Sequence, residues 1–87
     1  MKLCLISWEA VGKIREIYNE LKKRSITAAI EGDKETANRI SDIARSLLEV
    51  TAKDKYSRCD SIGIYVTEEK NDRYMEIMNR YVQAIGI

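Results

Sequence analysis

The chain has 87 residues, enough for one domain, which we predict to span residues 1–87. Its 15 basic and 14 acidic side chains nearly cancel to a net charge of +1, which disfavours partners held mainly by charge, such as bulk duplex DNA or an anionic membrane. No apolar run is long enough to span a bilayer, and two cysteines are too few for a disulfide framework or a zinc site. We therefore expect a cytoplasmic protein with free thiols and no membrane association.

The first predicted element is a short extended segment over residues 2–6, in which Leu3 and Leu5 alternate with less apolar neighbours. Ser7 then offers a hydroxyl that can cap a helix, and Glu9 places an acid in the first turn of that helix. A helix is therefore predicted to begin at Trp8.

Two long helical segments, residues 8–31 and 34–52, flank Gly32-Asp33. Glycine suits the left-handed position after a helix, and aspartate is a strong N-cap for the next one. The apolar stripe of the first segment comprises Val11, Ile14, Ile17, Tyr18, Leu21, Ala28 and Ala29, and that of the second comprises Ala37, Ile40, Ile43, Ala44, Leu47, Leu48 and Val50. Because the connection is so short, the helices must run antiparallel and bury these stripes against each other. Trp8, Ile26 and Ile30 lie outside the first stripe, so the pattern leaves their burial open.

Residues 53–61 are polar and are interpreted as a frayed helix end followed by a loop. Residues 62–66 then alternate, with Ile62, Ile64 and Val66 on one side, and β-branched residues dominate. This segment could pair with residues 2–6 as a two-stranded ribbon, or it could be an extended loop.

A third helix is predicted from Thr67, as N-cap, to about Ile85, with Gly86 as its stop. Its apolar residues cover an arc of about 180°, wider than the roughly 100° that packing on a hairpin requires. They are Tyr74, Met75, Ile77, Met78, Tyr81, Val82, Ala84 and Ile85. The predicted fold class is mainly α: an antiparallel helical hairpin plus a third helix, forming a three-helix bundle that could carry the ribbon of residues 2–6 and 62–66.

The absence of histidine removes the commonest general base and metal ligand, and with it any Ser–His–Asp or Cys–His catalytic system. The four glycines are isolated, so there is no glycine-rich phosphate loop. We expect neither an enzyme, nor a cofactor, nor a metal site. Cys4 and Cys59 could approach each other if the two extended segments pair.

The main functional hypothesis is a small non-enzymatic module that binds another protein, by occlusion or bridging. The predicted contact residues are Tyr74, Met75, Met78 and Tyr81, because aromatic rings and flexible thioethers are common where proteins meet. The structural alternative is that the third helix is the central one, covered by the hairpin and the strand. A further alternative is self-association of the same face as a homodimer.

A different hypothesis is nucleic-acid binding at the open end of the hairpin. In an antiparallel hairpin, a residue near 53 lies opposite one near 12, so a basic patch is predicted from Lys13, Lys53, Lys55, Tyr56 and Arg58. Four acids, Glu9, Glu16, Glu49 and Asp54, are expected close enough to neutralise much of this charge. On that ground the protein-binding hypothesis is preferred.

Overall fold

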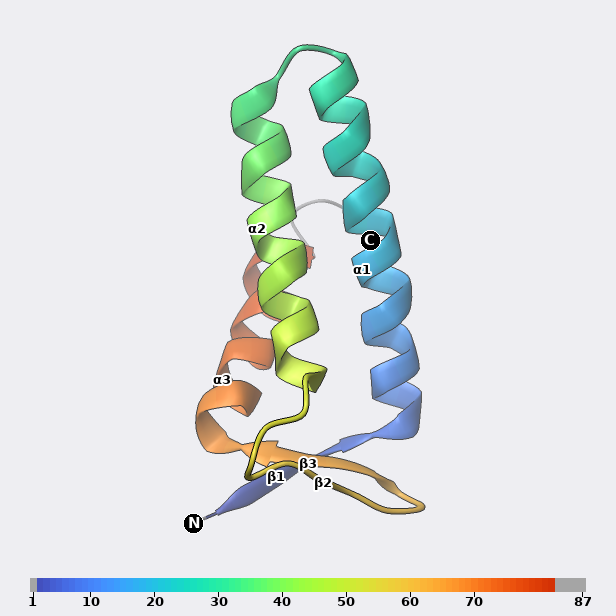
Figure 1. The fold of residues 1–87 in the computed structure, drawn as a ribbon, viewed down its shortest axis with the longest axis vertical. Helices are drawn as coiled ribbons and strands as arrows, with labels where there is room; N and C mark the ends of the chain where they lie inside the picture. The colour runs from blue at the N-terminus through green and yellow to red at the C-terminus, as the bar shows by residue number, and fades with distance from the viewer. Residues whose placement is uncertain (1, 83–87) are drawn as a thin grey trace.

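The computed structural model describes residues 2–82. In chain order its elements are β1 (Leu3–Ser7), α1 (Trp8–Ile30), α2 (Lys34–Thr51), β2 (Arg58–Cys59), β3 (Gly63–Thr67), α3 (Glu68–Ile77) and a π-helical segment (Met78–Val82). Two long helices stand on a small sheet, and α3 lies beside the lower half of α2 (Figure 1). The molecule is elongated, with extents of 44 × 21 × 21 Å.

The predicted helical hairpin is confirmed. Gly32 adopts a φ of +86°, the left-handed conformation expected after a helix, and the Asp33 carboxylate accepts the main-chain N–H of Thr36 at 3.1 Å. Ser7 caps α1 in the same way, accepting the N–H of Ala10 at 3.2 Å. These local signals end one helix and begin the next, and the chain therefore turns back after Ile30.

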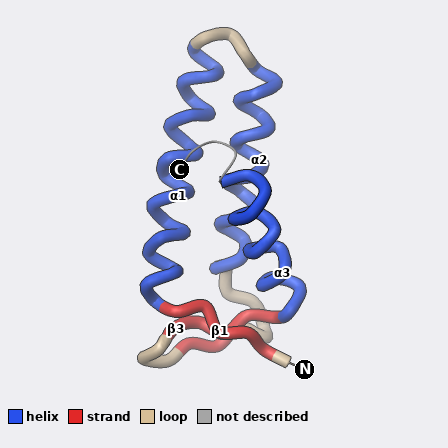
Figure 2. Tube along the Cα trace, turned by 180° about the vertical axis from the view of Figure 1, so that it is seen from behind, coloured by secondary structure: helices blue, strands red, loops and turns tan. Residues whose placement is uncertain are grey.

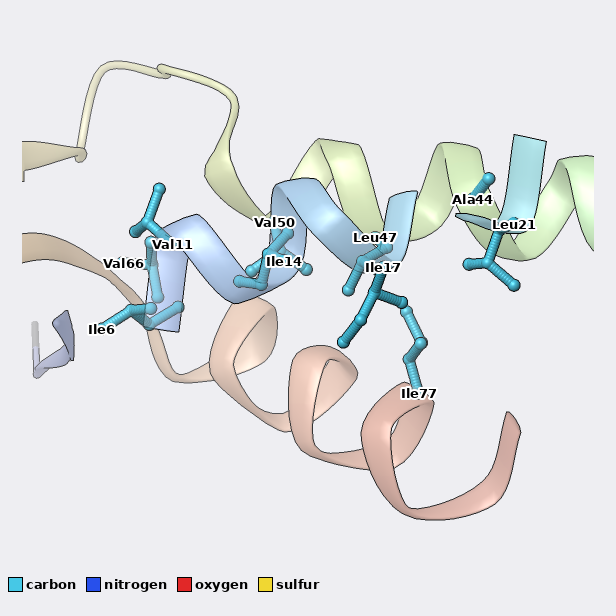
Figure 3. Close-up of a cluster of buried hydrophobic side chains, with 10 residues drawn as sticks. All are labelled: Ile6, Val11, Ile14, Ile17, Leu21, Ala44, Leu47, Val50, Val66 and Ile77. Carbon is cyan, nitrogen blue, oxygen red and sulfur yellow. The ribbon is translucent and has the colours of Figure 1, made fainter. Parts of the chain in front are cut away.

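A buried cluster fills the lower half of the hairpin and joins it to α3 and the sheet (Figure 3). Leu21, Leu47 and Val50 are fully buried, and they lie where both apolar stripes meet. The rest of the cluster comprises Ile6, Val11, Ile14, Ile17, Ala44, Val66 and Ile77. The tip of the hairpin extends beyond α3 (Figure 2), and Ile26 and Ile30 are exposed there.

The two extended segments pair, so the ribbon is confirmed, with each strand one residue later than predicted. β1 runs antiparallel to β3, with Leu5 opposite Tyr65 and Ile6 opposite Ile64. A third strand that the sequence did not reveal, β2, pairs with the other edge of β3, giving the order β1-β3-β2. Ile6 and Val66 face the helices and are buried, whereas Leu5 on the opposite face is 46% exposed.

Helix α3 begins as predicted at the Thr67 cap, whose hydroxyl accepts the N–H of Lys70 at 3.3 Å. It ends at Ile77, earlier than expected, and the chain continues to Val82 as a π-helix. The predicted end at Ile85 and Gly86 lies outside the described residues. No helix within residues 2–82 has the length and apolar character needed to cross a membrane.

Candidate functional site

A cavity of about 360 Å³ lies at the open end of the hairpin, between the start of α1, the α2–β2 loop and the sheet. Its floor is apolar, formed in part by Val11, Ile64 and Val66. Its remaining lining is mostly polar or aromatic and consists of Trp8, Arg15, Thr51, Lys53, Asp54, Ser57, Arg58 and Cys59. The volume is at the small end of the range of ligand sites, so the cavity has room for one small group.

The cavity brings together only part of the predicted basic patch. Lys53 and Arg58 line it, but Lys13 and Lys55 do not. On α1 the lining cation is Arg15, because two residues along a helix rotate a side chain by about 200° and Lys13 therefore points elsewhere. The prediction matched positions along the helix axis and ignored this rotation.

Tyr56 is 41% exposed and lies next to the cavity rather than in its lining. The Lys55 ammonium lies 4.9 Å from the centre of the Tyr56 ring, a cation–π contact. These two residues therefore extend the basic and aromatic character of the open end beyond the cavity itself.

The acids expected to neutralise this end are partly occupied by α3. Lys70 pairs with Asp54 at 2.7 Å, and Arg73 pairs with Glu49 at 3.7 Å. Glu9 and Glu16 do not line the cavity. Within residues 2–82, the three cations in the lining, Arg15, Lys53 and Arg58, form no ion pair. The cavity therefore has a positive rim.

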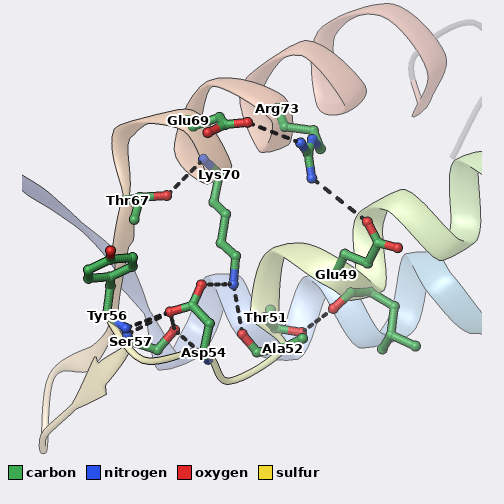
Figure 4. Close-up of polar contacts among 11 residues, drawn as sticks. Glu49, Thr51, Ala52, Asp54, Tyr56, Ser57, Thr67, Glu69, Lys70 and Arg73 are labelled. Carbon is green, nitrogen blue, oxygen red and sulfur yellow. Dashed lines mark hydrogen bonds and ion pairs between the residues drawn. The ribbon is translucent and has the colours of Figure 1, made fainter.

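The loop that carries Lys53 and Ser57 and leads into Arg58 of β2 is held by Asp54 and Lys70 (Figure 4). Asp54 Oδ1 accepts the main-chain N–H groups of Tyr56 at 2.8 Å and Ser57 at 2.9 Å. The Lys70 ammonium also donates to the main-chain oxygen of Ala52 at 2.9 Å. The hydrogen bond from Lys70, followed by that from the Tyr56 N–H, lowers the pKa of Asp54 from 3.8 to about 2. The carboxylate therefore stays ionised, and the loop stays tied to α3, at ordinary pH.

Trp8 is 45% exposed, yet its ring is held in place. Its indole N–H donates to the main-chain oxygen of Asp60 at 2.8 Å. The Asp60 carboxylate in turn accepts the N–H of Ile62 at 2.8 Å and the hydroxyl of Tyr65 at 2.9 Å, and these bonds lower its pKa. Asp60, which directly follows β2, thus anchors an aromatic side chain at the cavity.

Sequence reasoning did not assign Trp8, Arg15 or Ser57 to the site. The signal that could have found Trp8 is its place outside the apolar stripe of the first helix. At 100° per residue, Arg15 falls within about 20° of Trp8 on α1, so a helical projection could have found it too. Ser57 carried no such signal, since its position depends on the fold of the loop.

The predicted contact face of the third helix is mostly turned inward. Tyr74 and Met78 pack against the buried cluster, as the structural alternative anticipated, whereas Met75 is 49% exposed. The side chain of Tyr81 lies outside the described part of the structure. The described residues therefore do not form a broad exposed Tyr/Met face.

The two cysteines are free thiols and do not approach each other. Cys4 lies on β1 and Cys59 on β2, and β3 separates these strands, which corrects the expectation that strand pairing could join the two residues. Among residues 2–82 there is no group of three or more histidine, cysteine or acidic side chains that could hold a metal ion.

Comparison with known proteins found no matching family model, no matching curated protein and no matching solved structure. The chemistry of the cavity and of the surfaces around it is therefore the basis for a functional proposal.

Proposed function

We propose that the protein binds single-stranded nucleic acid through the cavity at the open end of its hairpin. The observation that carries this proposal is the distribution of charge. Lys70 and Arg73 of α3 occupy Asp54 and Glu49, while the cations of the cavity rim keep no acidic partner among residues 2–82. Phosphate groups are the natural counter-charge for such a rim, and the exposed rings of Trp8 and Tyr56 suit unpaired bases.

The small net charge of +1 is compatible with this proposal, because the contact is local. Three cations that each meet one phosphate of a single strand give a slope of log affinity against log salt concentration of about −2. This is a modest salt dependence, typical of a short contact rather than of a protein that coats a long nucleic acid.

The test is fluorescence anisotropy of a labelled short oligo(dT) strand, titrated with protein at increasing potassium chloride. We expect a slope of about −2 for the native protein. Arg15→Gln should weaken binding at low salt by about tenfold and reduce the steepness of the slope, because one charged contact is lost.

The matched control is Lys13→Gln, which removes the same charge from the same helix but outside the cavity lining. It should leave affinity nearly unchanged. Equal losses for both variants would show that net charge alone matters, and an oligo(dT) strand that does not bind even at low salt would overturn the proposal.

A second candidate is binding to another protein, the function preferred on sequence grounds. Support comes from exposed apolar side chains outside the cavity, among them Met75 on α3 and Ile26 and Ile30 at the hairpin tip. The contact surface on α3 is narrower than predicted, because Tyr74 and Met78 pack inward. Self-association is the related alternative, and the molar mass from light scattering distinguishes a dimer from a monomer.

A further inference from the structure

The cavity has an aromatic wall whose orientation is set before any ligand arrives. Trp8 leaves 45% of its surface exposed, although burial of so large an apolar ring would be favourable. The ring is kept at the cavity by the hydrogen bond from its indole N–H to the main-chain oxygen of Asp60. Because this bond uses the polar edge of the indole, the surface of Trp8 that stays exposed at the cavity is aromatic surface that a ligand can contact.

Asp60 is itself well anchored, which makes the position of Trp8 rigid. Its N–H donates to the main-chain oxygen of Gly63 at 3.0 Å, and its carboxylate bridges Ile62 and Tyr65. The main-chain N–H of Trp8 also donates to the main-chain oxygen of Ile62 at 3.2 Å. A side chain fixed at both its backbone and its ring loses little conformational entropy when a ligand stacks on it.

The chemistry next to the ring indicates what that ligand is. Arg15, Lys53 and Arg58 line the same cavity, so an aromatic surface and a cationic rim lie together. A planar, uncharged ring joined to a phosphate matches both parts, and a nucleotide is such a group. In a duplex the faces of each base are covered by the neighbouring bases. Only an unpaired nucleotide can therefore present a free base face to the Trp8 ring.

We propose that the cavity receives one unpaired nucleotide, whose base stacks on Trp8 while its phosphate contacts the cationic rim. This inference rests on the proposed function and makes it more specific. It assigns a preference for single strands over duplexes, and for strands with bases over strands without them. It assigns no preference among the four bases, because each of them has a flat face that can stack.

The single tryptophan of the chain provides a direct measurement. The native protein is titrated with a short oligo(dT) strand and with an abasic strand of the same length, while Trp8 fluorescence is recorded. A parallel anisotropy titration gives both affinities. We expect oligo(dT) to quench Trp8 saturably and to bind about tenfold more tightly than the abasic strand, which should cause no quenching.

Two variants separate stacking from folding. Trp8→Ala should bind oligo(dT) and the abasic strand equally while keeping the salt slope, and Trp8→Phe should retain most of the preference for oligo(dT). Circular dichroism checks that each variant is folded.

The outcomes distinguish the two proposals. If oligo(dT) and the abasic strand bind equally to the native protein without a change in Trp8 fluorescence, the stacking inference is overturned and nucleic-acid binding stands. It is also overturned if Trp8→Ala keeps the full preference. If neither strand binds at low salt, the proposed function itself fails.

Discussion

At the scale of single residues, the two glycines of the hairpin have opposite roles. Gly32 has a φ of +86°, a conformation that side chains with a Cβ adopt only at a cost. Gly12 lies on the exposed side of α1, and a Cβ added there would meet no atom within 4 Å. The same substitution should therefore have opposite effects at the two positions.

We expect Gly32→Ala to lower the free energy of unfolding by about 1 kcal/mol, because the left-handed turn becomes strained. Gly12→Ala should raise it by up to about 1 kcal/mol, because alanine is the better helix former. Urea denaturation followed by circular dichroism measures both changes. Two changes of the same sign would contradict the assignment of the turn to Gly32.

At the scale of elements, the bond between α3 and the α2–β2 loop gives a prediction for pH. The pKa of Asp54 is lowered from 3.8 to about 2 in the folded protein, first by Lys70 and then by the Tyr56 N–H. A lowered pKa means that the folded state favours the ionised carboxylate. The resulting stabilisation is complete well above pH 4 and is lost as the pH falls toward 2.

Thermal unfolding of the native protein and of Asp54→Asn between pH 7 and pH 2 should therefore show a melting-temperature difference that is largest above about pH 5 and shrinks toward pH 2. The control is Asp42→Asn, which changes an exposed acid of α2. Its melting temperature should differ little from that of the native protein at every pH between 7 and 2. A difference for Asp54→Asn that does not vary with pH would indicate that ionisation of this carboxylate does not stabilise the loop.

The packing of α3 also accounts for part of the wide apolar arc predicted for the third helix. The arc of about 180° left open whether this helix has a spare face or is covered by the hairpin and the strand, and in the structure α3 packs on both α2 and the sheet. Ile77 is buried, and Tyr74 and Met78 are half-buried against the same cluster. A helix at such a junction needs a wider apolar arc than one that packs on a single neighbour.

At the scale of the whole molecule, the large buried side chains lie in the part of the hairpin near the sheet, where α3 closes the core, while the small residues Ala28 and Ala37 are buried nearer the tip. We expect Tyr74→Ala and Met78→Ala each to lower the free energy of unfolding by about 1–2 kcal/mol, roughly half the loss for a fully buried side chain. Met75→Ala is the matched control on the exposed side and should change it by less than about 0.5 kcal/mol.

Chemical denaturation of the three variants gives these values. If Tyr74→Ala and Met78→Ala leave stability unchanged, the two side chains do not belong to the core. The Tyr/Met face predicted from the sequence would then remain available as a partner-binding surface.

The sequence by itself left the pairing of residues 2–6 with residues 62–66 open against an extended loop, but it determined the hairpin and the caps at Ser7, Asp33 and Thr67. These features depend on residues close in the chain, whose conformational preferences and periodicity act locally. Lys53 and Arg58 could also be assigned to the open end, because a tight turn determines which residues of the two antiparallel segments lie at the same height along the hairpin axis.

Only the tertiary structure decided the rest of the site. The cations of the cavity rim lack acidic partners among residues 2–82 because Lys70 and Arg73, from a distant part of the chain, pair with Asp54 and Glu49. The position of Trp8 depends on Asp60, 52 residues away. Contacts between distant residues follow from how the whole chain packs, and local patterns carry no information about them.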